Sequence, residues 1–232
     1  MAERILPTPD VFATCCPDGE KILEYYAATF GSAYVQLHPF IKAVSIKPDQ
    51  FSPATYPARS TILNTCVPVS WSEVVAKTGL PSIAAVDVGL RTMILGLRKE
   101  FSCQEYADKI ESLAGTDQIL PPDEGHFSDL LHDRTLSAIQ SLGYQWVWVG
   151  DELGTERKLF WIEDLKGNDT KETAGHCNIF TPDRKLLWTT HWDSHFSLLC
   201  SSERNLLDLQ NAYEFEGFFC TSLTEVYWSV RS

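Results

Sequence analysis

The sequence contains no long hydrophobic run and no apolar leader. A membrane-spanning helix needs about 20 consecutive apolar residues, and no stretch of this 232-residue chain approaches that length. The opening residues, MAERILP, lack the basic end and apolar core of a signal peptide. These absences exclude a membrane protein and predict a soluble protein in the cytoplasm, with no membrane partner.

Basic residues are also scarce. The chain has 19 Lys and Arg against 31 Asp and Glu, which gives a net charge of −12 and a pI near 4.9. A nucleic-acid-binding protein needs a basic face to displace counterions from phosphate, and no run of three basic residues occurs here. We therefore expect no nucleic-acid partner. The excess of acidic residues favours encounter with a basic protein. Alternatively, this excess serves only to keep the protein soluble.

The cysteines lack the spacing of zinc or redox sites. Seven are present, an odd number, and no C-x-x-C pair occurs among them, so neither a zinc ribbon nor a thioredoxin-like motif is indicated. Unpaired thiols in a reducing compartment fit this pattern best. The adjacent pair Cys15 and Cys16 is interpreted as two loop residues, with a redox switch as the alternative.

The common catalytic motifs are missing as well. The chain has no G-x-S-x-G nucleophile elbow, no glycine-rich phosphate loop and no H-E-x-x-H zinc motif. The sequence therefore indicates no cofactor and favours a binding protein over an enzyme.

The spacing and type of the hydrophobic residues divide the chain into a part with helical periodicity and a part with strand-like segments. Helical periodicity predicts helices at 20–30, 71–78, 83–99, 103–114 and 127–142, and a short strand at 33–37. After Gly143 the segments are aromatic and β-branched, as strands tend to be. Six of the seven tryptophans lie between 146 and 228. Most of them, Trp146 and Trp148 included, are expected to be buried in the core.

The predicted fold class is therefore α+β. A mainly helical part, 1–143, is followed by a tryptophan-rich, mainly antiparallel sheet at 144–232 that contains one helix near 202–213. The two parts could be separate domains or one compact domain.

Two helix starts carry the S-x-x-E capping pattern, at Ser70 and at Ser102. The segment 71–98, with a turn at Gly79, also resembles a helix-turn-helix. Its second helix would open at Ser82 without an early Arg, Asn or Gln to read base edges. A packed helical hairpin is therefore favoured over DNA binding.

The densest polar cluster is HWDSH, residues 191–195. His191, Asp193 and His195 are metal-ligand types, but on a straight strand the two histidines would lie about 13 Å apart, because each residue rises about 3.3 Å. Only a turn at Asp193-Ser194 could gather all three, with His176 as a further ligand. A turn between two strands, without a metal, is the favoured interpretation.

Trp192 is the tryptophan expected to be exposed, because it lies beside this turn. Tryptophan is common at the centres of protein interfaces. We therefore take Trp192, Asp193 and His195 as the candidate partner-binding residues, with burial of Trp192 in the core as the alternative.

Short motifs in residues 20–125 resemble a bacterial family, domain-of-unknown-function family 2711. They are LHPF at 37–40, VSW at 69–71 with TGL at 78–80, and VGLRT at 88–92. Separately, the final 60 residues resemble bacterial toxin-immunity proteins through WTTHWD at 188–193 and EGFF at 216–219. Neither resemblance implies catalytic residues.

These observations favour an acidic protein-binding protein, in its most specific form an immunity-like neutraliser of a basic toxin. The alternative is a metal-dependent enzyme that uses His191, Asp193 and His195.

Overall fold

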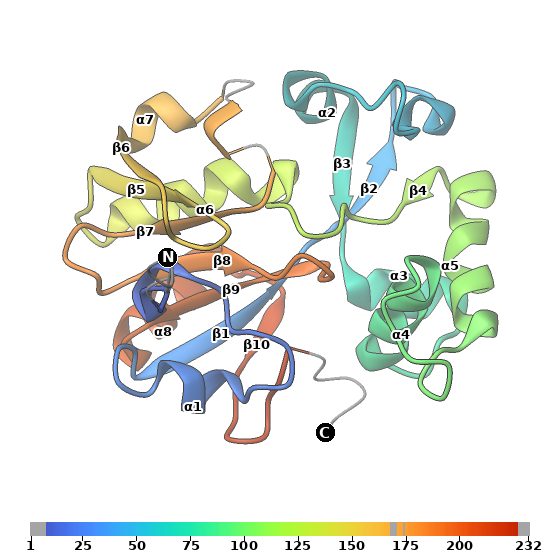
Figure 1. The fold of residues 1–232 in the computed structure, drawn as a ribbon. Helices are drawn as coiled ribbons and strands as arrows, with labels where there is room; N and C mark the ends of the chain where they lie inside the picture. The colour runs from blue at the N-terminus through green and yellow to red at the C-terminus, as the bar shows by residue number, and fades with distance from the viewer. Residues whose placement is uncertain (1–7, 168–170, 174, 227–232) are drawn as a thin grey trace, which may run out of the picture.

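A seven-stranded antiparallel sheet dominates the computed structural model, which describes residues 8–167, 171–173 and 175–226. Its strand order is β10-β1-β9-β8-β7-β5-β6, and it forms the left lobe in Figure 1. The strands are β1 (Ser32–Leu37), β5 (Trp146–Asp151), β6 (Arg157–Trp161), β7 (Cys177–Phe180), β8 (Leu187–Thr190), β9 (Phe196–Ser201) and β10 (Gly217–Phe219).

Both faces of this sheet are covered, so its central strands are buried on both sides. In β9, Leu198 and its neighbour Leu199 belong to different core clusters, because successive side chains point to opposite faces. One face packs against α6 (Asp129–Ser141), α7 (Ile162–Leu165) and α8 (Glu203–Tyr213). The other packs against η1 (Val11–Ala13) and α1 (Ile22–Tyr26).

A second lobe is built around a three-stranded antiparallel sheet of order β3-β2-β4 (Figure 1). Its strands are β2 (Phe40–Ala43), β3 (Cys66–Val69) and β4 (Ile119–Leu120). Its helices are η2 (Pro48–Phe51), α2 (Arg59–Thr65), α3 (Trp71–Thr78), α4 (Ile83–Met93) and α5 (Gln104–Thr116); the remaining short helix, η3 (Lys171–Thr173), lies near β7 in sequence.

The two lobes share one hydrophobic core. Only His38 and Pro39 separate β1 of the large sheet from β2 of the small one. A single cluster of buried side chains extends from Val35 and Leu198 in the large sheet to Val86 and Ile110 in the helices of the second lobe. The lobes are therefore packed together rather than joined by a free linker.

The α+β class and the mainly antiparallel sheet are confirmed. The division at residue 143 stays a prediction, and β1 is one element before it that pairs inside the sheet of the later residues. The sequence also predicts a closing strand at 225–230, which lies largely outside the described residues. The helix expected at 20–30 is shorter, Ile22–Tyr26.

The local helix signals succeeded at α3 and failed at two other places. The Oγ of Ser70 accepts from the N–H of Glu73, and Gly79 ends α3 at φ +66°. The second capping pattern is wrong, because Ser102 bonds the Lys99 carbonyl and does not cap α5. Helix α4 ends at Met93 rather than 99 because Leu95 takes a left-handed conformation, with φ at 61°.

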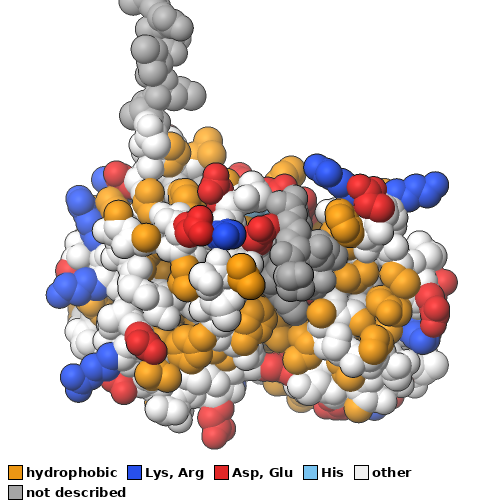
Figure 2. All heavy atoms as spheres, turned by 90° about the horizontal axis from the view of Figure 1, so that it is seen from below, with side chains coloured by type: hydrophobic (Ala, Val, Ile, Leu, Met, Phe, Trp, Pro, Cys, Tyr) orange, Lys and Arg blue, Asp and Glu red, His pale blue; other side chains and the backbone are white. Residues whose placement is uncertain are grey.

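Seen from below, hydrophobic side chains are exposed on both lobes, with Asp and Glu side chains among them (Figure 2). Within the part of the chain that the structure describes, no helix combines the length and the apolar character needed to cross a membrane.

Candidate functional site

The residues 191–195 form the connection between β8 and β9, which extends from the large sheet toward the second lobe (Figure 1). The N–H of Ser194 donates to the carbonyl oxygen of His191 over 3.0 Å, so Trp192 and Asp193 are the central residues of a β-turn. The expected turn is therefore present, but it lies one residue earlier than Asp193-Ser194.

The two histidines of the connection line different cavities. His191 and Trp192 line the first cavity, of about 410 Å³, whereas His195 lines the second, of about 670 Å³. The turn thus separates the two imidazoles that a metal site would have to bring together. Across residues 8–167, 171–173 and 175–226, no three His, Cys, Asp or Glu side chains are grouped so that they could hold a metal ion.

His176 has a structural role beside the connection. Its ring stacks on that of His126 at 4.9 Å, and its Nδ1 donates to the carbonyl oxygen of Gly125 over 2.8 Å. His176 lines neither of the two cavities. The structure therefore does not place it with His191 or His195 around a common point.

Gly125 fixes the position of the connection, and sequence analysis missed it. Its N–H donates to the carbonyl oxygen of Ser194 over 2.8 Å. A Cβ here would lie 2.4 Å from the Trp192 carbonyl oxygen and 2.4 Å from His176 Cε1, and φ is +68°. Only glycine permits this close approach. The sequence signal for it was slight, a glycine after two acidic residues at 123 and 124.

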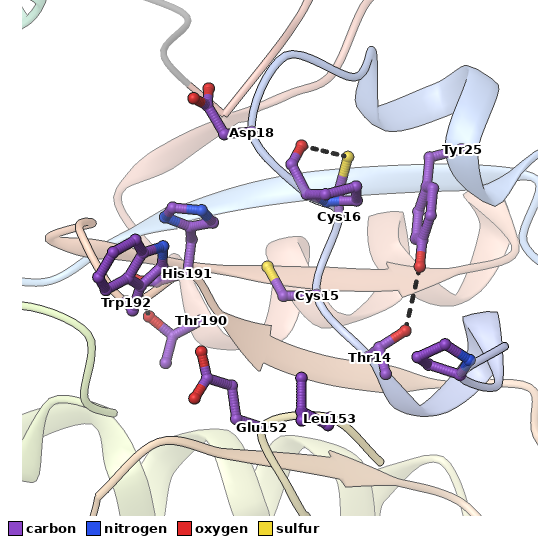
Figure 3. Close-up of a pocket in the computed structure, with 12 residues that line it drawn as sticks. Thr14, Cys15, Cys16, Asp18, Tyr25, Glu152, Leu153, Thr190, His191 and Trp192 are labelled. Carbon is purple, nitrogen blue, oxygen red and sulfur yellow. Dashed lines mark hydrogen bonds between the residues drawn. The ribbon is translucent and has the colours of Figure 1, made fainter. Parts of the chain in front are cut away.

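The first cavity combines an exposed tryptophan with acidic residues (Figure 3). Trp192 is 57% exposed, so its expected exposure is confirmed, and Asp193 is half-buried. Glu152, from the turn between β5 and β6, and Asp18, from the segment before α1, also line the cavity. No Lys or Arg is among the described residues that line it.

Two cysteines lie in the wall of the first cavity. Burial raises the pKa of the Cys15 thiol to about 12, and burial together with the neighbouring Cys15 raises the pKa of the Cys16 thiol as well. Both thiols are therefore protonated at neutral pH. A protonated thiol is a poor nucleophile and a poor metal ligand. Cys15 and Cys16 therefore line the cavity without forming a reactive centre.

The histidines of the site are neutral at pH 7. Burial lowers the pKa of His191 to about 4, against the opposing effect of Asp193. Burial and the positive charge of Arg91 lower the pKa of His195 to about 3. His38 lies beside His195, and burial lowers its pKa to about 3 as well. These imidazoles are therefore uncharged, and neither ring nitrogen of His38 nor the Nδ1 of His195 hydrogen-bonds within the described residues.

His195 does not share a surface with Trp192. It is 2% exposed, and it contributes to the second cavity instead. Of the three candidate partner-binding residues, only Trp192 and Asp193 are accessible from outside.

The family model "Protein of unknown function (DUF2711)" matches residues 18–230 of the chain. The chain belongs to this family. The match extends well beyond the 20–125 segment whose motifs resembled DUF2711, and it takes in the tryptophan-rich sheet as well. The likeness of the final 60 residues to toxin-immunity proteins gains no support from it.

A relative in Bacillus subtilis (strain 168), "Uncharacterized protein YwbB", is similar to this DUF2711 protein over nearly its whole length. The two are 20% identical over 216 residues, which cover 91% of this chain and 96% of the relative. No solved structure matches the chain significantly.

Proposed function

We propose that this DUF2711 protein binds another protein by taking a basic side chain of the partner into the first cavity, beside Trp192. The observation that carries the proposal is the pairing of an indole that is 57% exposed with a cavity lined by carboxylates. The face of an indole ring attracts a cation within about 6 Å. Glu152 and Asp18 supply negative charge around the same space.

Three further features support a basic protein partner. The cavity volume of about 410 Å³ lies within the range of ligand pockets, about 300–1,000 Å³. The net charge of −12 speeds the encounter with a positively charged surface. Tryptophan is also among the residues that dominate binding energy at interfaces.

The proposal covers only the binding of a basic side chain of a partner protein. Neutralisation of a toxin rests only on the resemblance of the final 60 residues, and the site adds nothing to it. The alternative of a metal-dependent enzyme lacks geometric support, because His191 and His195 line separate cavities. A cytoplasmic location, favoured by seven unpaired cysteines, belongs to the same proposal.

The test uses two blocked peptides that differ only in charge, Ac-Gly-Arg-Gly-NH₂ and its citrulline analogue. Binding to the full chain is measured by NMR titration, with the Trp192 indole N–H as the reporter. We expect the arginine peptide to bind at least tenfold more tightly, and the difference to shrink in high salt because exposed charges are screened. Equal binding of the citrulline peptide would rule out recognition of a cation.

Variants locate the binding. Glu152→Gln removes a carboxylate that lines the cavity, whereas the matched control Glu156→Gln removes one from the same turn that lies outside it. We expect the first to weaken arginine-peptide binding several-fold and the second to leave it unchanged. Trp192→Ala should abolish it, with binding followed on the signals of the peptide because the indole reporter is gone, and a thermal melt checks that folding is intact.

A further inference from the structure

The second cavity lies where the two lobes meet. His195 reaches it from the large sheet, while Leu90, Met93 and Ile94 of the α4 region form the facing wall. Segments 51–56 and 120–124 complete the lining. Its volume is about 670 Å³, and ligand sites occur preferentially at such junctions between structural units.

One buried polar atom at this cavity has no partner. His195 is 2% exposed, and its Nδ1 makes no hydrogen bond among the described residues. An unsatisfied buried polar atom destabilises the folded state, so native proteins retain few of them without a reason. The adjacent cavity offers the space from which a ligand can supply the missing hydrogen bond.

The imidazole is suited to an uncharged group. With a pKa of about 3, the ring is neutral at pH 7, and its Nδ1 donates or accepts according to tautomer. An amide, a hydroxyl or a heterocyclic nitrogen can meet either requirement. A charged group at the same depth would have to leave water. An anion would find no Lys or Arg in the described lining, and a cation would find carboxylates only at the exposed Asp123 and Glu124.

The rest of the lining is mostly apolar and includes two acidic residues. Phe51 packs edge-on against Tyr56 at 5.5 Å, and the lining includes three prolines at 53, 121 and 122. Asp123 and Glu124 are exposed at the opening, and Asp123 hydrogen-bonds Tyr56. The described lining holds no Lys or Arg, which disfavours phosphate and carboxylate ligands.

We infer that the second cavity binds an uncharged, mostly apolar small molecule whose polar group hydrogen-bonds to His195 Nδ1. This site is separate from the one proposed for a basic side chain, because Trp192, Glu152 and Asp18 line only the first cavity.

The test compares four naphthalene probes of nearly equal size, namely 2-naphthamide, 2-naphthylmethylamine, 2-naphthoate and naphthalene itself. Binding to the full chain is measured by ligand-observed NMR. We expect 2-naphthamide to bind at least tenfold more tightly than the anion, the cation or the bare hydrocarbon. Binding of the amine or the carboxylate at the level of the amide would overturn the inference of an uncharged ligand.

Two variants assign the contact. His195→Leu removes the polar atom and should erase the preference for 2-naphthamide over naphthalene while both still bind. Met93→Trp fills the cavity from its wall without altering His195, and it should abolish binding of all four probes. Undiminished binding in Met93→Trp would overturn the assignment to this cavity, even if His195→Leu failed to fold. Trp192→Ala should leave the probes unaffected, which separates this site from the first cavity.

Discussion

The N–H of His38 donates a hydrogen bond of 3.1 Å to the carbonyl oxygen of His195. His38 stands between the two sheets, since β1 ends at Leu37 and β2 begins at Phe40. The bond therefore ties the start of β9 to the point where the chain passes from one lobe into the other. The Nε1 of Trp71 donates to the His38 carbonyl over 2.6 Å, which adds the start of α3 to the same junction.

Glu216 caps a helix that begins 145 residues earlier. Its carboxylate accepts from the N–H of Trp71 at 2.7 Å and from the N–H of Ser72 at 2.9 Å. An anion at a helix N-terminus satisfies free N–H groups and complements the helix dipole. We expect Glu216→Gln to lower the free energy of unfolding by about 0.5–2 kcal/mol, measured by urea denaturation. Glu214→Gln, an exposed neighbour, is the control and should change it little.

The buried pair Asp87 and Arg91 is expected to be sensitive to the loss of either member. Arg91 Nε lies 3.0 Å from Asp87 Oδ1, and both side chains are 0% exposed. Arg91 also donates to the carbonyl oxygen of Val226 over 2.8 Å. Arg91→Leu removes the guanidinium from beside a buried carboxylate and should cost about 3–5 kcal/mol of unfolding free energy.

A double variant tests whether charge is the cause. Replacing both members, Asp87→Leu with Arg91→Leu, removes the carboxylate as well and should recover much of the stability lost in the single variant. A double variant as unstable as Arg91→Leu alone would mean that lost packing and the bond to Val226 account for the effect.

Stability should fall as the pH drops from 6.5 toward 4. Burial lowers the pKa of five histidines below 6.5, to about 3 for His38 and His195 and to about 4 for His191; the other two are His126 and His132. In this range the unfolded chain binds protons that the folded chain does not, so acid favours unfolding. Desolvation raises the pKa of Asp123 and Glu124, which acts in the opposite direction but involves fewer groups.

The measurement is urea denaturation at pH 7.5 and at pH 5. Each histidine proton contributes about 1.4 kcal/mol per pH unit to the slope of the unfolding free energy. His38→Gln removes one titrating group and should make the slope shallower. Equal stability at the two pH values would contradict the neutral state of these imidazoles.

All seven cysteines should react as free thiols once the protein is unfolded. None is in a disulfide, and five of them are buried: Cys16, Cys66, Cys177, Cys200 and Cys220. Burial raises the pKa of Cys177 and of Cys220 to about 12, so these thiols are protonated and shielded. Titration with a thiol reagent should find seven groups in denaturant without reductant, and few that react quickly in the native protein. Recovery of only one group would indicate three disulfides.

Sequence reasoning worked where structure is decided locally. Helix α3 was predicted residue for residue, because Ser70 and Gly79 carry its start and its end within the segment itself. The end of α4 depends on a leucine at positive φ, a conformation that the residue type does not announce. The exposure of Trp146, at 45%, was also missed. Its strand is covered only in part, because its partner β6 is the edge of the sheet.

The geometry of the site could not be predicted from local sequence patterns, for a different reason. The residue types at 191–195 indicate a candidate site, but the geometry of these residues depends on contacts from distant segments of the chain. Gly125 holds the connection from outside it, and Leu90 and Tyr56 line the second cavity together with His195. Such neighbours are set by the packing of the two lobes, which no spacing within the chain specifies.

The anchoring of the β8–β9 connection has a mechanical consequence. The short β8–β9 connection contributes residues to both cavities. Gly125 packs so closely against Trp192 and His176 that not even a Cβ would fit between them. A molecule that pushes His195 aside must therefore displace the backbone that carries Trp192. By linkage, a ligand of the second cavity that moved His195 in this way would change the affinity of the first cavity for its own ligand, and the reverse effect would be of the same size.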